Sequence, residues 1–290
     1  MVTNIVVGTL VLAAIYGLVG AGFVLLFRAT GVLNFAQGAF MVVGALIFWT
    51  LTQALSLGLV AGFVISMVVV AVCAMLAYRV LLARLQGVSG LVLTIASVGL
   101  GTALLAVANL IWGPDEKTIS GMLGNHRIVI AGSLGVTPID IAALVVGVVG
   151  LAGLTAFIRF TRAGLRMRAT ADSTILAAYS GARPRRMSAL AWALAGATAA
   201  AAGICYALRG PLDPPAIFGL GLAVFPAIIL GGIDSLGGVV LGAFLIGLVQ
   251  STVNVVIGAA WGAPVSYLVL VVVIMVRPRG LFGSVHAARV

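Results

Sequence analysis

Side chains with the capacity for chemistry are scarce in this chain of 290 residues. It contains two histidines and six acidic residues, and His126 and His286 have no carboxylates spaced to orient them. No zinc-binding HExxH, nucleophile-elbow GxSxG or phosphate-binding GxxxxGK[ST] pattern occurs. We therefore expect no catalytic residue, no metal site and no cofactor, and an enzyme is disfavoured.

Uncharged polar side chains within apolar sequence are the remaining candidates. Such residues either line a path for a small polar solute or form hydrogen bonds between membrane helices; they are Asn34, Gln37, Thr94, Ser97, Asn109, Gln250 and Asn254. A glycine-containing break at membrane depth is tolerated only where protein or a water-filled cavity surrounds it. The alternative is an ordinary cytoplasmic turn. We predict a substrate pathway lined by Asn34, Gln37, Gly38, Thr94, Asp234 and Ser235.

The composition excludes a soluble domain. Hydrophobic residues make up 63% of the chain and charged residues 8%, with a mean hydropathy of +1.29. We predict an all-α polytopic protein of the lipid bilayer, one transmembrane domain over residues 1–290, with eight or nine transmembrane helices. The net charge of +10 comes from arginines at the ends of spans. It therefore reflects membrane topology and not a nucleic-acid partner.

The apolar runs give the predicted order of spans: 5–27, 41–51, 55–78, 88–112, 141–158, 189–208, 216–233, 236–257 and 259–276. The first run lacks the features of a cleaved signal peptide. Basic segments predict a cytoplasmic loop at 159–187 and a cytoplasmic tail at 277–290, and the segment 113–139 is predicted to be external. Discontinuous or re-entrant segments are expected near 28–38 and 230–238. Nine full spans place the N-terminus outside, and eight spans with a re-entrant piece place it inside.

The loop 159–187 carries seven arginines against one acid, Asp172. We predict that Asp172 caps a helix over 173–180, that Gly181 ends it in the left-handed conformation, and that Pro184 starts the next helix. Ile175, Leu176 and Tyr179 then share one face. This apolar face either docks onto a partner or belongs to a solvated loop. The spans contain almost no ionisable residues for ion coupling, so docking of an ATP-hydrolysing partner is the expected energy source.

Two glycine-flanked polar pairs interrupt apolar sequence in a similar way. They lie in the segments 30–38 and 231–238, near the start and near the end of the chain. Interrupted helices at matching positions are typical of transport proteins built from internal repeats. Glycine-rich helices that pack closely produce a similar pattern. An internal repeat is one of two interpretations.

An ordered set of motifs resembles the permease subunits of branched-chain amino-acid ABC importers, of the Liv type. The motifs are GVLNFAQG at 31–38, WGP at 112–114, GLRMRA at 164–169 with SG at 180–181 and PRR at 184–186, IILGGIDSLGG at 228–238 and VRPRGLFG at 276–283. They cover almost the whole length in the family's order. Permeases of urea and short-amide importers are similar, so the resemblance leaves the solute open.

The resemblance implies a multi-pass protein of the bacterial cell membrane. Its expected partners are a second permease subunit, homologous or a copy of this chain, two ABC ATPase subunits and an extracytoplasmic solute-binding protein. The family's coupling signature falls on Ala177 and Gly181, without the glutamate that opens its classical form. With the loop residues above, the ATPase-coupling set is Asp172, Ile175, Leu176, Ala177, Tyr179 and Gly181. The implied function is ATP-driven uptake by alternating access. The alternatives are an ATP-independent channel or facilitator and a membrane scaffold.

Overall fold

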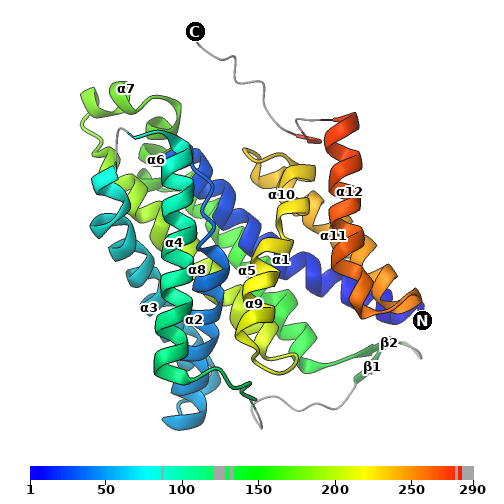
Figure 1. The fold of residues 1–290 in the computed structure, drawn as a ribbon. Coiled ribbons are helices and arrows are strands. Elements are labelled where there is room, and N and C mark those ends of the chain that lie inside the picture. Colours follow the sequence, from blue (N-terminus) through cyan, green and yellow to red (C-terminus); the bar gives the residue numbers. More distant parts are fainter. Residues whose placement is uncertain (86–87, 120–127, 131–133, 278–279, 283–290) are drawn as a thin grey trace.

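The helical architecture accounts for the apolar composition. A computed structural model describes residues 1–85, 88–119, 128–130, 134–277 and 280–282. Within these residues nine helical segments are long and apolar enough to cross a membrane. The prediction of an all-α polytopic fold is thereby confirmed (Figure 1). The described part of the segment 113–139 adds one two-stranded antiparallel hairpin, β1 (Ile128–Ile130) with β2 (Leu134–Val136).

The elements follow one another along the chain with short connections. The spanning elements are α1 (Val2–Thr30), α2 (Gln37–Trp49) with a π-helical turn (Thr50–Ala54), α3 (Leu59–Val80), α4 (Gly90–Trp112), α5 (Pro138–Phe160), α8 (Pro184–Ala207), α9 (Pro214–Ala223) with α10 (Phe225–Gly231), α11 (Leu236–Val256) and α12 (Gly262–Val276). Between α5 and α8 lie α6 (Arg162–Asp172) and α7 (Thr174–Tyr179). Short 3-10 turns occur at Leu82–Leu85 and Ala259–Trp261.

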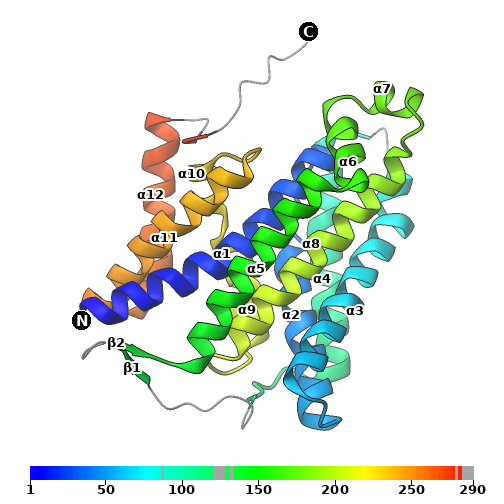
Figure 2. The same cartoon turned by 180° about the vertical axis from the view of Figure 1, so that it is seen from behind.

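Two helices form the centre of the bundle. Within the most apolar stretch of 18 residues, 78% of the residues are buried in α1 and in α8. The corresponding share in the span that contains α12 is 11%. α1 packs against α5, α8 and α11, and α8 packs against α2 and α3 (Figure 2). The outer helices α3, α4, α5 and α12 direct large apolar side chains outward, as helices that face lipid do.

The two ends of the bundle differ in character. The N-terminus and the β1–β2 hairpin lie at one end, and α6 and α7 lie at the other (Figure 1). With the arginine-rich loop inside, the five spans that precede it place the N-terminus outside. This is the first of the two predicted topologies. At the predicted external end, Asp140 and Thr137 form a capping box at the start of α5. Asp140 also forms an ion pair with Arg209, whose Nε donates to Asp140 Oδ1 over 3.0 Å. This pair joins the start of α5 to the segment that follows α8.

The predicted span 216–233 is interrupted in the structure. The segment 216–233 divides into α9 and α10, which meet at Val224 and Phe225. Pro226 lies in the first turn of α10 and has no backbone N–H, so it cannot continue the hydrogen-bond ladder of α9. The expected discontinuity near 230–238 is present as well, between α10 and α11.

Close contact between α8 and α2 depends on Gly203. A Cβ atom at this position would overlap the backbone carbonyl of Met41. We expect Gly203→Ala to lower the stability of the purified protein by about 1–3 kcal/mol, the usual range for an overpacked core. Thermal unfolding in detergent measures the effect. Gly153→Ala is the matched control, because open space surrounds Gly153. Equal stability of the two variants would contradict this packing.

Candidate functional site

The connection between α1 and α2 re-enters the helical bundle. Gly31 ends α1 in the left-handed conformation with φ of +69°. The side chain of Gln37, the first residue of α2, bonds the carbonyl of Ala195. Ala195 lies eleven residues after the start of α8, about 16 Å along the axis at ~1.5 Å per residue. The start of α2 therefore lies at membrane depth, as expected for a discontinuous segment near 28–38.

Asn34 and Gln37 form a hydrogen-bonded pair within this connection. Asn34 Nδ2 donates to Gln37 Oε1 over 3.3 Å, and Asn34 Oδ1 accepts from the backbone N–H of Ala36 over 3.0 Å. Gln37 Nε2 donates to the carbonyl oxygen of Ala195 over 3.0 Å. Both side chains are buried, with exposed fractions of 1% and 0%. In this conformation the two amides bond to each other and to backbone groups of the connection and of α8.

Ser97 of α4 completes the support of this connection. Its Oγ accepts from the backbone N–H of Phe35 over 3.0 Å and lies 2.7 Å from the carbonyl of Thr94, to which it can donate. Thr94 itself is half-buried and bonds within its own helix, to Gly90. Ser97 of α4 thus contacts the interrupted segment, whereas the hydroxyl of Thr94 bonds within α4.

The break between α9 and α10 meets the break between α1 and α2. The ring of Phe225 stacks on that of Phe35 with centroids 5.0 Å apart, and its edge contacts Phe23 at the same distance. Gly38 packs against the backbone of Phe218 and Gly221 in α9. Sequence reasoning missed this meeting point, although Pro226 within an apolar run is a signal for the second break.

Asp234 and Ser235 belong to a third interruption, between α10 and α11. Gly232 has φ of +105°, and Ser235 caps α11 by accepting from the N–H of Gly238. Arg28 Nε, near the end of α1, donates to the backbone carbonyl of Asp234 over 2.6 Å. The structure therefore links Asp234 to the end of α1, whereas Asn34, Gln37 and Gly38 contact α8 and α9. The internal repeat remains a prediction.

The arginine-rich loop contains two helices where one was predicted. Thr161 caps α6 by accepting from the N–H of Gly164. Met167 and Thr170 are buried, and α6 packs against α1, α5 and α8. The buried positions Gly164, Met167 and Thr170 recur every third residue, a helical period that identifies α6 in the sequence in retrospect.

The prediction that Asp172 caps the short helix is wrong. The N–H of Ser173 still bonds the carbonyl of Ala169, so Asp172 is the last residue of α6 and has a helical backbone. Ser173 is extended, with φ of −156°, and its Oγ accepts from the N–H of Leu176 over 3.3 Å. An N-cap residue needs this non-helical conformation. The predicted left-handed Gly181, with φ of +80°, and the predicted helix start at Pro184 are confirmed.

The short helix α7 presents apolar side chains to solvent at the end of the bundle. Leu176 and Tyr179 are 67% and 87% exposed, whereas Ala177 is 3% exposed. The side chain of Ile175 lies outside the described residues. α7 packs on α6 and on the start of α8. The buried alanine holds the helix on the protein while the larger side chains remain available.

Comparison with known proteins follows the same regions. A family model described as the permease component of branched-chain amino acid transport systems matches residues 5–276. The chain is 25% identical to the high-affinity branched-chain amino acid transport system permease protein LivH of Escherichia coli, over 96% of this chain and 94% of that protein. It is 27% identical to BraD of Pseudomonas aeruginosa, which carries the same description, over 98% and 96% of the two chains.

A solved structure shares the fold. It is PsaBC from Streptococcus pneumoniae in complex with Fab, which matches with a TM-score of 0.52 at 13% identity. The match covers 93% of this chain and 91% of the other.

Removal of the Ser97 hydroxyl tests the support of the interrupted segment. Ser97→Ala leaves the partly buried N–H of Phe35 without its acceptor, and we expect a loss of about 1–3 kcal/mol in stability. Thr102→Ala on the same helix is the matched control, because the Thr102 hydroxyl is exposed and bonds only its own helix. Thermal unfolding in detergent compares the two variants. If both behave like the unmodified protein, Ser97 does not support the connection.

Proposed function

The chain belongs to the family of permease components of branched-chain amino acid transport systems, and we propose that it imports a branched-chain amino acid or a related small polar solute. Urea and short amides are the related solutes that the resemblance leaves open. The family match over residues 5–276 supports this proposal. Membership in this family also makes the chain a multi-pass, non-catalytic subunit that works with partner ATPases and a binding protein.

The proposed assembly contains two permease subunits, two ABC ATPase subunits and one extracytoplasmic solute-binding protein. The second permease is either a homologous chain or a copy of this one. ATP is hydrolysed on the ATPase subunits, which dock on the arginine-rich side. The binding protein delivers the solute on the side of the β1–β2 hairpin.

The exposed apolar face of α7 is the observation that carries the ATP-driven mechanism. Leu176 and Tyr179 insert into a groove of the ATPase subunit, and the arginines around them provide an electrostatic frame. Asp172, Ile175, Ala177 and Gly181 complete the coupling segment. Buried Ala177 keeps α7 close to the bundle, and Gly181 ends the helix with the positive φ that glycine adopts readily.

Movement of α7 reaches the spans through α6. α6 contacts both α7 and the central helices α1 and α8, and Met167 is buried at this junction. Closure of the ATPase dimer displaces α7, and α6 transmits the displacement to α1 and α8. At each of the three interruptions no continuous helix joins the two neighbouring segments, so one segment moves without the other. The result is alternating access.

The proposed solute pathway contains Asn34, Gln37, Gly38, Thr94, Asp234 and Ser235. Amide groups of Asn34 and Gln37 have both donors and acceptors, which suit the polar ends of an amino acid, urea or an amide. In the described conformation these groups bond to each other and to Ala195. When α2 moves away from α8 during transport, the amides of Asn34 and Gln37 break these bonds and form hydrogen bonds with the solute instead.

An acidic side chain on the docking face tests the coupling. We expect Leu176→Asp and Tyr179→Asp each to reduce uptake and solute-stimulated ATP hydrolysis at least about tenfold, because an unpaired carboxylate buried in an interface costs several kcal/mol. Uptake and ATPase activity of the reconstituted importer measure the effect. Leu81→Asp is the control, since Leu81 is also exposed but follows α3, outside the α6–α7 loop. Normal uptake by both α7 variants would contradict docking.

Cysteine accessibility tests the pathway. Asn34→Cys and Gln37→Cys are made in a chain whose own Cys73 and Cys205 are replaced by alanine. We expect small polar thiol reagents to modify the new cysteines during ATP-driven uptake and only slowly without ATP, because both positions are buried in the described conformation. Ser66→Cys, a buried position on α3, serves as the unreactive control. Inert cysteines at 34 and 37 in every state would show a purely structural role.

A further inference from the structure

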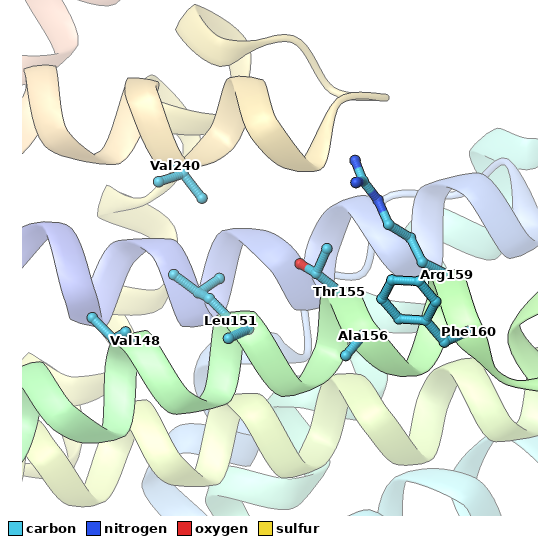
Figure 3. A pocket seen from close by; sticks show the side chains of 8 residues that line it. Val148, Leu151, Thr155, Ala156, Arg159, Phe160 and Val240 are labelled. Atoms are coloured by element: carbon cyan, nitrogen blue, oxygen red, sulfur yellow. The ribbon is translucent and has the colours of Figure 1, made fainter.

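An open groove of about 430 Å³ lies between α5 and α11. Both helices pack against α1, which separates them, and Val240 of α11 faces the α5 side chains across this gap (Figure 3). The walls consist mainly of aliphatic and aromatic side chains, including Val148, Leu151 and Phe160 of α5. Val148 and Val240 are 66% and 45% exposed. An exposed apolar groove on spanning helices faces lipid hydrocarbon.

A single charged residue marks one end of this groove. Arg159 lies in the last turn of α5, at the predicted cytoplasmic end, and it is the one charged member of the lining. Its side chain extends away from α5 toward α11 (Figure 3). Among the residues that the structure describes, no acid forms an ion pair with Arg159. The groove therefore has apolar walls along its length and one positive charge at its predicted cytoplasmic end.

The length of the groove matches one lipid leaflet. Eleven residues separate Val148 from Arg159, which corresponds to about 16 Å along a helix that rises ~1.5 Å per residue. The hydrocarbon core of a bilayer is about 30 Å thick, so one leaflet occupies about half of that. An acyl chain that starts at the level of Arg159 would end near Val148.

We propose that the α5–α11 groove binds one anionic phospholipid of the cytoplasmic leaflet. The guanidinium of Arg159 binds the phosphate, for which its planar set of donors is well suited. Thr155, one turn deeper, places a polar side chain in the groove at the level expected for the glycerol esters (Figure 3). One acyl chain lies along Leu151 and Val148 and contacts Val240. This site is independent of the transported solute.

Photo-crosslinking in bilayers of known composition tests the site. The full chain is reconstituted in phosphatidylcholine vesicles that contain a small fraction of phosphatidylglycerol or phosphatidylcholine with a diazirine in the acyl chain. Labelled peptides from α5 and α11 are quantified by mass spectrometry. We expect the phosphatidylglycerol probe to label both helices about fivefold more than the phosphatidylcholine probe, the preference that one basic side chain gives for an anionic lipid.

Two variants separate the charge from the shape of the groove. Arg159→Gln should bring labelling by the anionic probe down to that of the neutral probe, whereas Arg168→Gln, an exposed arginine of α6, should leave it unchanged. Ala156→Phe should fill the groove and reduce labelling by both probes. Equal labelling by the two probes in the unmodified chain would show an unselective lipid-facing surface and overturn the proposal.

Discussion

Backbone hydrogen bonding in a medium without water is the constraint on which this structure depends. A helix satisfies its own N–H and C=O groups, and an interrupted segment at membrane depth must find other partners. Between α1 and α2 these partners are specific: Asn34 accepts from Ala36, and Ser97 accepts from Phe35. The interruption is therefore supported by α4 through its backbone and by α8 through the side chain of Gln37. Its polar side chains are part of the architecture as well as candidates for solute binding.

The same principle explains how the interruptions are connected. The aromatic contact between Phe35 and Phe225 joins the first break to the break between α9 and α10. Arg28 joins the end of α1 to the break before α11 through the carbonyl of Asp234. Three places where helices end are thus in contact with α1 or with the segment that follows it. α1 also contacts α6, so the central helix connects the arginine-rich loop to these breaks.

The sequence was sufficient for the fold class, the span order and the short helix α7, because each has a local signal. Apolar run length identifies spans, arginines identify the loop, and Gly181 and Pro184 delimit α7 and α8. The break at Phe225 and the cap at Ser173 were missed for different reasons. A proline in an apolar run is compatible with a kinked continuous helix. Asp172 and Ser173 are both good caps, and the length of α6, which the packing of Met167 against the bundle supports, decides between them.

The alanine-rich surface of α8 has a mechanical consequence. Its buried face consists largely of alanine and glycine, and Gly196 and Gly203 approach the backbones of α3 and α2 closely. Such small side chains let helices pack closely and leave few large side chains that would have to change rotamer as the helices slide, and Trp192 is the large buried exception on α8. Shear between packed helices is one of the two common modes of domain motion. Sliding of α8 along α2 and α3 would therefore have to move the ring of Trp192 past Tyr78, on which it stacks, and past Phe40, which it meets at an angle.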